Sequence, residues 1–523
     1  MNTTEARYAE MSRKILELNE WIVLYYYDYE TPFWGKPPLS FWASAASMWA
    51  FGVNEFGARF APFFFGLLCC GLFFAWIFRR NDGESWALRP IACAVILSTT
   101  GIGFVASGAV MTDEALLFCV MLCMISFWRC CVGNLTLGVG NSFLTQDTRI
   151  TDNFNESSLR CARSETISTK QSKDLPKNNH ITLFGYLFFV GLGLGLLAKG
   201  PLIFVLVGLP ISAFLFIVRC FTPYTQILHL KNLPFFSGTA LMLLIALPWY
   251  IAFEVKSEGF LEYFIIGEHF KRFFVSGWEG DLYGNAHSQP IGTIWWFFFI
   301  SFLPWSVVFL GFVAKKIYGF FKIRKDFGVR DLAMDSARIA PNPANIENLY
   351  LALWILMPLC FLTFSRNILE AYTLPCAPAF CILMTNFIFG TKGKFSRGIW
   401  LLPLSLMLIL CAFLASGKLD SLVDSRHQKD IFTRWDGEGR IIFLDAKPSF
   451  SGYFYAHQSA KKPFKDEFLS LKSPQISAIL DSNEKICIAM KERDYLKNKE
   501  RFGNFAPIVA KKEWILLKNL GSL

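Results

Sequence analysis

The feature that most constrains the fold of this chain is a series of long apolar stretches. A bilayer core about 30 Å thick is crossed by roughly 20 helical residues, and about ten stretches approach or reach that length. They lie near residues 57–78, 88–107, 114–132, 181–198, 201–221, 235–253, 293–314, 349–364, 370–390 and 397–416. Because lipid offers the backbone no hydrogen-bond partners, such spans must be helices. The pattern predicts an α-helical polytopic membrane protein.

The composition agrees with a membrane protein and excludes several other classes. Of the 523 residues, 53% are hydrophobic and 18% are charged, which is too apolar for an ordinary soluble enzyme. The net charge of +10 does not indicate a nucleic-acid partner, because the Lys and Arg residues fall mostly in short runs between apolar spans. Most of the 14 cysteines lie inside apolar stretches, where cysteine behaves as a small hydrophobic residue.

The basic residues predict which loops face the cytoplasm, since cytoplasmic loops are enriched in Lys and Arg. If the segment before residue 57 is extracytoplasmic, every basic-rich loop falls on the opposite side. These loops carry Arg79, Arg80, Arg149, Arg160, Arg163, Lys170, Lys173, Lys177, Arg219, Lys231, Lys315, Lys316, Lys322, Arg324, Lys325, Arg330, Lys392, Lys394 and Arg397. The remaining charges, at the ends of apolar helices, then share the extracytoplasmic side, and such charges indicate function.

The same map predicts the domain organisation. A polar tail holds short apolar runs, RIIFLDA, KICIAMK and KEWILLK, and a helical segment, ERDYLKNKERFG, which together are typical of a small α/β domain. We expect an extracytoplasmic juxtamembrane segment at 1–56, a multi-span transmembrane domain at 57–416 and an extracytoplasmic α/β domain at 417–523. Within the transmembrane domain we expect a flexible cytoplasmic insertion at 133–180 and an extracytoplasmic loop at 254–292.

The first 21 residues, MNTTEARYAEMSRKILELNEW, are amphipathic and contain no span that could carry the N-terminus across a membrane. The predicted orientation therefore requires either that the native gene starts upstream of Met1 or that this segment is re-entrant. N-terminal sequencing of the purified protein distinguishes the two.

The stretch YETPFWGKPPLSFW places Lys36 before two prolines and among aromatic residues. Proline removes backbone donors and disfavours a helical conformation in the residue before it, so Lys36 is held on a non-helical corner. One interpretation is an interfacial anchor, with a lysine that extends toward the head groups. The other is a cation that binds a lipid phosphate. The stretch LLAKGPL repeats this arrangement at Lys199, which favours an anionic ligand.

Acidic and further basic residues occur on the same predicted side. Glu5 and Arg7 lie in TEARYAE, and Asp113 lies at a helix start in VMTDEALLF, where it acts either as a helix cap or as a carboxylate poised for acid or base chemistry. The loop segment GEHFKRF contributes His269, a weak metal-ligand candidate, and Arg272, a stronger phosphate candidate.

These motifs occur in one order along the chain: TEARYAEMSRKI, FWGKPPLSFW, FGVNEFGARF, GLGLLAKGPL, EHFKRF and TFSRNILEAYTLPCAPAF. The ordered set resembles that of bacterial GT-C glycosyltransferases, in the group similar to protein O-mannosyltransferases and to the aminoarabinose transferase that modifies lipid A. The resemblance covers nearly all of the membrane region, and the tail resembles the extracytoplasmic C-terminal domain of that group more loosely.

The resemblance implies a multi-pass enzyme of the bacterial inner membrane with a periplasmic active site. Such an enzyme, a hexosyl- or pentosyltransferase, moves a sugar from an undecaprenyl-phosphate donor to lipid A or another envelope glycolipid. By motif, the expected catalytic residues are Asp113, an acid near the reacting carbon, and Glu5, which could substitute for a missing base. The residues expected to bind donor or acceptor phosphate are Arg7, Lys36, Lys199, Arg272 and Arg366. Fixed cations of this kind stabilise the charge that develops on a phosphate leaving group.

Two positions depart from the pattern of this family. Thr4 stands where an Asp usually precedes the Glu of the first motif, and Gly35 stands where Glu or Asp often precedes Lys-Pro-Pro. The first departure removes the expected general base and the second a candidate metal ligand, so the cofactor is left unassigned. An anionic phosphate acceptor needs a base less than a hydroxyl does, which favours lipid A. The alternatives are protein O-glycosylation, a transporter or flippase, and an inactive paralogue that binds lipid.

Overall fold

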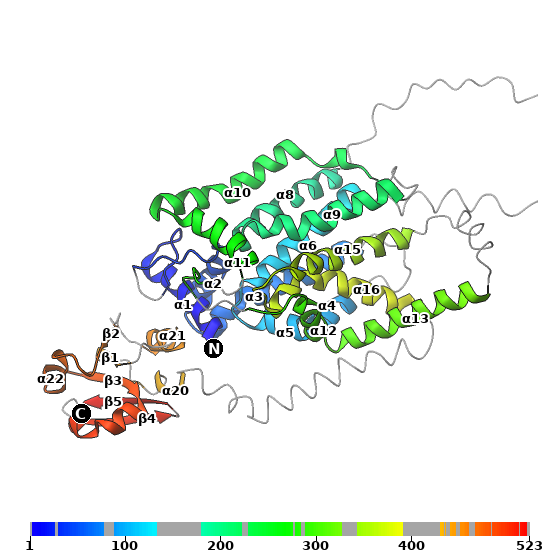
Figure 1. Ribbon diagram of the computed structural model, residues 1–523. Helices are drawn as coiled ribbons and strands as arrows, with labels where there is room; N and C mark the ends of the chain where they lie inside the picture. Colours follow the sequence, from blue (N-terminus) through cyan, green and yellow to red (C-terminus); the bar gives the residue numbers. More distant parts are fainter. Residues whose placement is uncertain are drawn as a thin grey trace, which may run out of the picture.

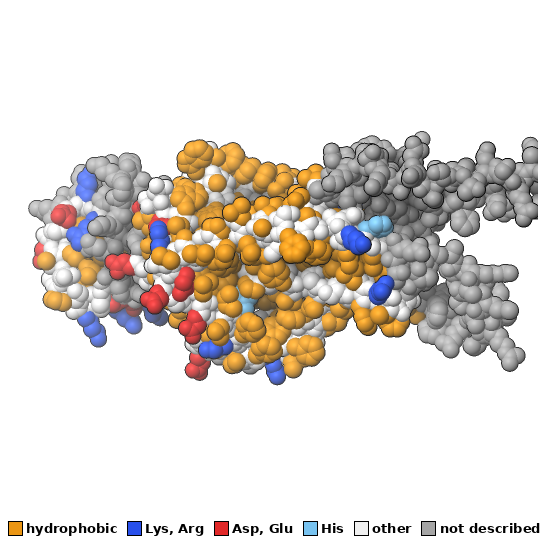
Figure 2. Space-filling model, turned by 90° about the horizontal axis from the view of Figure 1, so that it is seen from above, with side chains coloured by type: hydrophobic (Ala, Val, Ile, Leu, Met, Phe, Trp, Pro, Cys, Tyr) orange, Lys and Arg blue, Asp and Glu red, His pale blue; other side chains and the backbone are white. Residues whose placement is uncertain are grey.

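The computed structural model describes residues 3–26, 30–77, 88–132, 179–221, 228–275, 278–283, 288–326, 343–390, 429–432, 435, 440–445, 450–459, 466–482, 484–511 and 513–519. Within these ranges the chain forms a long helical bundle with a small sheet at one end (Figure 1). Hydrophobic side chains cover most of the visible face of the bundle (Figure 2). Acidic side chains gather toward the end that carries the sheet, and basic side chains occur near both ends of the bundle. This distribution is that of a body immersed in lipid with its charges toward the ends.

Six helical segments of the described chain are long and apolar enough to cross a membrane. They are α3 (Glu55–Ile77), α6 (Asp113–Cys131), α9 (Leu202–Phe221), α10 (Phe235–Lys256), most of α15 (Pro343–Thr363), and the continuous pair η5 (Glu370–Cys376) and α16 (Ala377–Gly390). Helix α8 (Asn179–Lys199) contributes a shorter apolar segment and packs against α6 and α10. The predicted polytopic α-helical fold is confirmed, and the chain is a multi-pass membrane protein.

Two of the predicted spans are broken rather than straight. Helices α4 (Leu88–Thr99) and α5 (Gly101–Gly108) meet at 81°, and α12 (Thr293–Ser301) meets the following α13 (Trp305–Asp326) at 107°. The breaks contact each other, because the indole of Trp305 donates to Thr99 Oγ1 at 2.9 Å and the amide of Gly101 donates to the Leu303 carbonyl at 3.2 Å. The Gly101 amide at one bend is thus satisfied by the backbone of the other, as a lipid environment requires.

Several predicted segments lie outside the described residues. They are the span at 397–416 and almost all of the insertion at 133–180.

Helix α1 (Thr3–Leu18) lies between the membrane bundle and the C-terminal sheet (Figure 1). Its neighbours are α2 (Leu39–Phe51), which follows the Lys-Pro-Pro corner, and α21 (Phe450–Ser459) of the C-terminal region. Most of its residues from Ala6 to Ile15 are buried, including the ion pair of Arg13 with Glu10 at 2.8 Å. The amphipathic pattern of the first residues is therefore explained by burial against protein on several sides.

The C-terminal region forms a five-stranded mixed sheet in the order β2-β1-β3-β5-β4. Strand β1 pairs in parallel with β2 and β3, whereas β5 pairs antiparallel with β3 and β4. The strands are β1 (Arg440–Leu444), β2 (Asp466–Leu469), β3 (Ile486–Lys491), β4 (Phe505–Lys511) and β5 (Trp514–Asn519), with short helices α20 (Lys429–Phe432), α22 (Gln475–Leu480), α23 (Glu492–Lys497) and η6 (Lys499–Phe502). The predicted small α/β fold is confirmed.

The sheet is joined to the membrane region by shared packing and by a polar network. One cluster of buried side chains includes Ala9 of α1, Phe454 of α21 and Phe443 of β1. Glu55, at the start of α3, accepts from Lys429 Nζ at 2.7 Å and from the Tyr455 hydroxyl at 2.6 Å. These contacts fix α1, and the residues it carries, between the two regions.

Phe454→Ala is expected to loosen this junction. Phe454 is fully buried, and truncation of a buried Phe costs about 3–5 kcal/mol through lost burial and the cavity that it leaves. Limited proteolysis in detergent should release the C-terminal region faster than in the wild type. Leu496→Ala is the control, because that side chain is 63% exposed. Equal cleavage rates for the Phe454 variant and the control would contradict the packing described.

Candidate active site

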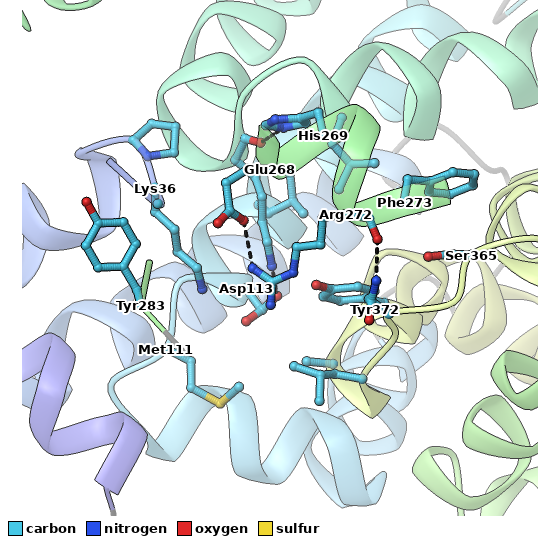
Figure 3. Close-up of a pocket in the computed structure, with 18 of the residues that line it drawn as sticks. Lys36, Met111, Asp113, Glu268, His269, Arg272, Phe273, Tyr283, Ser365 and Tyr372 are labelled. Atoms are coloured by element: carbon cyan, nitrogen blue, oxygen red, sulfur yellow. Dashed lines mark hydrogen bonds and ion pairs between the residues drawn. The ribbon is translucent and has the colours of Figure 1, made fainter. Parts of the chain in front are cut away.

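A cavity of about 370 Å³ lies where the ends of several helices meet (Figure 3). Its walls come from α1, the Lys-Pro-Pro corner, the start of α6, the end of α8, residues of the stretches 264–273 and 281–283, and the loop that leads into η5. Five predicted site residues line it together: Arg7, Lys36, Asp113, Lys199 and Arg272. His269 lines it as well. Residues from widely separated motifs therefore share one cavity, although their chemical roles stay predictions.

The Lys-Pro-Pro corner points Lys36 into the cavity. Pro38 precedes α2 directly, so Lys36 lies just outside the helix. Its Nζ donates to the Tyr8 hydroxyl at 2.5 Å and to Thr112 Oγ1 at 3.3 Å. Among the described residues, no carboxylate lies within ion-pair distance of Lys36. This lysine is thus oriented by neutral groups and keeps its charge available to a ligand.

Arg7 lies beside Lys36 and also has no acidic partner among the described residues. Its NH1 group donates to the backbone carbonyl of Tyr283 at 3.0 Å, while its buried Nε has no hydrogen-bond partner. Between the two cations lies Tyr8. Burial alone would raise the pKa of the Tyr8 phenol, but the charges of Lys36 and Arg7 lower that pKa below its usual value. The corner is therefore electropositive enough to favour an anion.

Lys199 and Asp113 form an ion pair across the cavity, from the end of α8 to the start of α6. Their side chains are only 13% and 8% exposed. The alternative that Asp113 serves mainly as a helix cap is not needed to explain its position, because its carboxylate binds Lys199. Gly200, which follows the lysine, has φ of +74°, and a Cβ there would lie 2.6 Å from the Phe264 ring. Only glycine fits this close approach.

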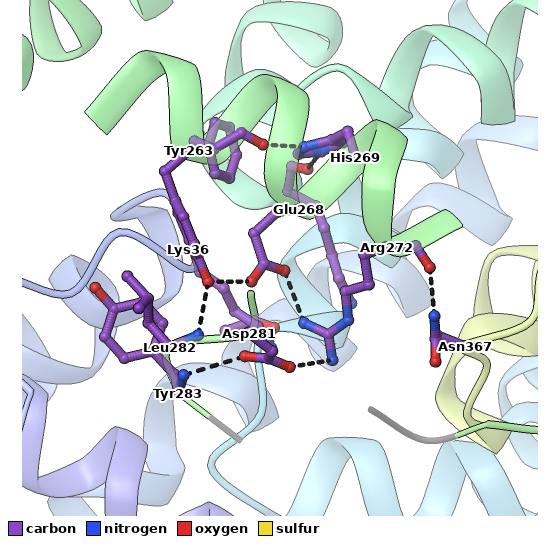
Figure 4. Close-up of polar contacts among 12 residues, drawn as sticks. Lys36, Tyr263, Glu268, His269, Arg272, Asp281, Leu282, Tyr283 and Asn367 are labelled. Carbon is purple, nitrogen blue, oxygen red and sulfur yellow. Dashed lines mark hydrogen bonds and ion pairs between the residues drawn. The ribbon is translucent and has the colours of Figure 1, made fainter. Parts of the chain in front are cut away.

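The π-helix η4 (Glu262–Lys271) supplies the opposite wall (Figure 4). Its wide turns bring residues five apart into contact, so the Tyr263 hydroxyl donates to Glu268 Oε1 at 3.0 Å. Glu268 accepts from Arg272 NH1 at 2.7 Å, and Asp281 lies 3.6 Å from Arg272 NH2. Burial would lower the pKa of Arg272, but the two carboxylates raise it, so the guanidinium stays charged. Short π-helical stretches frequently occur at functional sites.

His269 holds η4 against the end of α8. Its Nδ1 lies 2.8 Å from the Phe264 carbonyl oxygen and its Nε2 lies 3.2 Å from the Lys199 carbonyl oxygen. With both ring nitrogens against backbone oxygens, the imidazole positions Lys199.

Two predicted site residues do not line the cavity. Glu5 is bound by Arg59, which donates to its two carboxylate oxygens at 2.6 and 3.0 Å. Arg366 is exposed, and its backbone carbonyl accepts from the Gln289 amide at 2.8 Å. Thr4, which replaces the usual acid of the first motif, does line the cavity, so the departure from the family pattern falls inside the site.

The sequence reasoning missed four cavity residues that shape this site. Tyr8 and Tyr283 orient Lys36 and Arg7, and Glu268 orients Arg272. Asn367 binds the backbone of the Arg272 segment. The motifs contained the signal for Tyr8, which directly follows Arg7, and for Glu268, which lies four residues before Arg272 on a helix.

The described residues do not fit a resident metal ion. They contain no group of three or more His, Cys, Asp or Glu side chains that could hold one. A Cβ at Gly35 would lie 2.9 Å from the Phe33 ring and 3.3 Å from the Tyr283 ring, so the space for an acidic side chain is filled by aromatic rings. His269 already places both nitrogens against carbonyl oxygens.

If the chain catalyses the sugar transfer that its motifs imply, removal of divalent metals is expected to change the rate by less than about twofold. The assay is transfer by purified protein before and after treatment with a chelator, with readdition of Mg²⁺, Mn²⁺ or Zn²⁺. A loss of activity that is restored by one of these ions would contradict this expectation.

Comparison with known protein families gives a match over part of the chain. Residues 1–138 match the family model for dolichyl-phosphate-mannose-protein mannosyltransferase. Curated relatives named undecaprenyl phosphate-alpha-4-amino-4-deoxy-L-arabinose arabinosyl transferase include proteins from Yersinia pestis (strain Pestoides F), 26% identical over 390 residues, and Photorhabdus laumondii, 26% identical over 391 residues. Each alignment covers 73% of this chain, which spans about half, 54%, of the length of those relatives.

Solved structures agree with these sequence matches in fold. The crystal structure of ArnT from Cupriavidus metallidurans bound to undecaprenyl phosphate matches with a TM-score of 0.64 at 16% identity, over 99% of this chain and 94% of that one. The apo form of the same protein matches with a TM-score of 0.61, over 93% of its chain. These comparisons confirm the resemblance inferred from the motifs, and the structural match establishes a GT-C fold.

Proposed function

We propose that this protein is an inner-membrane glycosyltransferase that moves a sugar from an undecaprenyl-phosphate donor to lipid A or another envelope glycolipid on the periplasmic side. The curated relatives are named for a transfer of this kind, and one solved structure of the same fold holds undecaprenyl phosphate. Both matches support the proposed donor class.

The observation that carries the proposal is the pair of cations at the Lys-Pro-Pro corner, neither of which forms an ion pair in the described structure. Arg7 and Lys36 lie side by side without an acidic partner among the described residues, and the buried Nε atoms of Arg7 and Arg272 lack hydrogen-bond partners. Buried donors without partners cost free energy, so a site of this kind is completed by an anionic ligand. A phosphate supplies both the charge and the acceptor oxygens.

The lining of the cavity suits a lipid phosphate rather than a free one. Beside the charged groups it includes Leu116, Leu202, Leu206 and Phe361, all on or next to membrane-spanning helices. A phosphate bound at Arg7 and Lys36 thus has an apolar surface in the same cavity, which suits the first part of a prenyl chain.

The chemistry follows from these positions. An anionic oxygen of the acceptor phosphate attacks the anomeric carbon of the donor sugar, and the bond from that carbon to the donor phosphate oxygen breaks with its electron pair on oxygen. Arg7 and Lys36 stabilise the charge that develops on this leaving oxygen, because they are already fixed by Tyr283 and Tyr8 before the reaction begins. Lys199 and Arg272 line the same cavity, each held by a carboxylate, and in this proposal they contact the acceptor phosphate.

The acidic groups of the cavity favour an acceptor that needs no general base. Asp113 binds Lys199, and both Glu268 and Asp281 lie against Arg272. Thr4 has no carboxylate that could accept a proton. A phosphate of lipid A is already anionic, whereas a serine or sugar hydroxyl must lose a proton as it attacks. Protein O-glycosylation is therefore the less favoured enzyme function.

A second function, lipid binding without catalysis, is supported by the same two departures, Thr4 and Gly35. Transfer by purified protein separates it from the enzyme. Proteoliposomes that contain the wild-type protein, an undecaprenyl-phosphate aminopentose and lipid A should convert lipid A to a product heavier by one sugar residue. Donor binding with no product from any lipid or protein acceptor would replace the proposal by the lipid-binding function.

A further inference from the structure

One residue that lines the cavity carries a buried acceptor atom that the proposed phosphate site does not use. The side chain of Asn367 lines the cavity and is only 5% exposed. Its Nδ2 donates to the Arg272 carbonyl at 2.5 Å and to the Val275 carbonyl at 3.0 Å. Its Oδ1 is buried and has no hydrogen-bond partner in the described structure.

We infer that Asn367 Oδ1 accepts a hydrogen bond from a hydroxyl or amino group on a sugar ring that is bound next to the phosphate. Asn367 would then be a specificity-determining residue of the site. The inference rests on the proposed function for the presence of the sugar.

The orientation of the amide is fixed by its neighbours. The carbonyl oxygens of Arg272 and Val275 can only accept, so the amide nitrogen must face them and the amide oxygen must face the other way (Figure 4). Rotation by half a turn would place three oxygens against one another. The acceptor atom therefore cannot exchange places with the donor atom.

The backbone around Asn367 is also held in place. The Arg366 amide reaches the Phe273 carbonyl at 3.5 Å, and the Arg366 carbonyl accepts from Gln289 at 2.8 Å. Asn367 itself forms an isolated antiparallel bridge with Ser288. With the loop fixed on two sides, Oδ1 cannot move to find another partner within the protein, and a ligand is left to satisfy it.

The chemistry of the cavity identifies the kind of ligand group. The free charges of the site are cations, which are donors, and its carboxylates are already bound by Lys199 and Arg272. An ionised phosphate offers only acceptors, so it cannot satisfy Oδ1. The nearest donors to a bound sugar phosphate are the hydroxyl and amino groups of its own ring, and Asn367 contacts the backbone of Arg272, a proposed phosphate ligand.

The test is a coupling measurement between the residue and the sugar. Undecaprenyl-phosphate sugars that lack one ring hydroxyl or the amino group are compared with the complete substrate. The comparison is made in the wild type and in Asn367→Leu. One deletion is expected to lower kcat/KM of the wild type roughly 10- to 100-fold, because it leaves a buried acceptor unpaired. The same deletion should have no effect in the variant. An equal effect of every deletion in both proteins would overturn the inference and leave Asn367 a purely structural role.

The same comparison with acceptor glycolipids that lack single hydroxyls shows which substrate donates the hydrogen bond to Asn367 Oδ1. Coupling with either set supports the contact and assigns it to that substrate. If Asn367→Leu fails to fold, Asn367→Ser keeps a donor for one carbonyl but is too short to reach the ligand. Asn498→Ser is the matched control, since Asn498 also donates to a backbone carbonyl, that of Asp494 at 2.9 Å, but lies in the C-terminal region.

A binding measurement keeps this test independent of catalysis. Wild-type protein should bind the undecaprenyl-phosphate sugar more tightly than undecaprenyl phosphate, and Asn367→Ser should lose that preference while it retains affinity for undecaprenyl phosphate. Absence of transfer with an intact preference would reject the proposed function but not the Asn367 contact. A preference that persists in the variant would reject the contact.

Discussion

Lys36→Ala is expected to lower kcat/KM for sugar transfer by at least about 100-fold, the scale seen when one preorganised donor is removed from a charge-stabilising site. The reason is that Lys36 is held by Tyr8 and Thr112, without an ion pair in the described structure, where the proposed function puts the leaving phosphate. Folding should be little affected, since the side chain forms no ion pair in the described structure. The measurement is turnover in proteoliposomes together with thermal unfolding in detergent.

Lys256→Ala is the matched control for this prediction. That lysine forms an ion pair with Glu20 at 2.6 Å, but its side chain is 44% exposed, and exposed pairs contribute little. Its removal should leave transfer nearly unchanged. Turnover that is equal in the Lys36 variant, the control and the wild type would reject Lys36 as a phosphate ligand.

Asp113→Asn is expected to reduce both stability and transfer. It leaves Lys199 buried without its partner, and breaking a buried pair typically costs about 3–5 kcal/mol. Transfer should fall by about 100-fold or more, since Lys199 loses the contact that orients it toward the acceptor. Thermal unfolding and turnover of the same preparation measure the two effects.

A double variant separates these effects. Asp113→Asn with Lys199→Gln removes both charges, so much of the lost stability should return while transfer stays low. Glu20→Gln, which breaks the exposed pair with Lys256, should alter neither property. If Asp113→Asn unfolded at the wild-type temperature, the buried pair would be contradicted.

The sequence predicted those parts of the molecule that depend on local pattern. Apolar stretches of about 20 residues became helices because lipid permits little else, and the alternation of short apolar runs with turns became the C-terminal sheet. Charges at the ends of apolar helices, such as Asp113 and Lys199, do meet in one cavity. A charge at the end of a membrane helix costs free energy unless it forms an ion pair or binds a ligand. Such charges are therefore rare, and a sequence that contains them indicates a functional site.

The sequence could not supply what depends on contacts between distant segments. One hydrogen bond joins Trp305 to Thr99 and another joins Gly101 to Leu303, and together they stabilise the bends between α4 and α5 and between α12 and α13. The residues of each pair lie about 200 positions apart in the sequence. Glu5 matched a family motif, yet Arg59 of α3 occupies its carboxylate. Asn367 lies inside the last motif, TFSRNILEAYTLPCAPAF, but the motif does not show its role, since that role depends on two carbonyls of another segment.

The most direct test of the central claim is mass spectrometry of lipid A from cells that express the protein and from cells that lack it. Lipid A from cells that express the protein should include a species heavier by one sugar residue, attached to a lipid A phosphate. That species should disappear when the gene is deleted and should not return with Lys36→Ala. Identical lipid A in all of these strains, with the protein present in the membrane, would contradict lipid A as the acceptor.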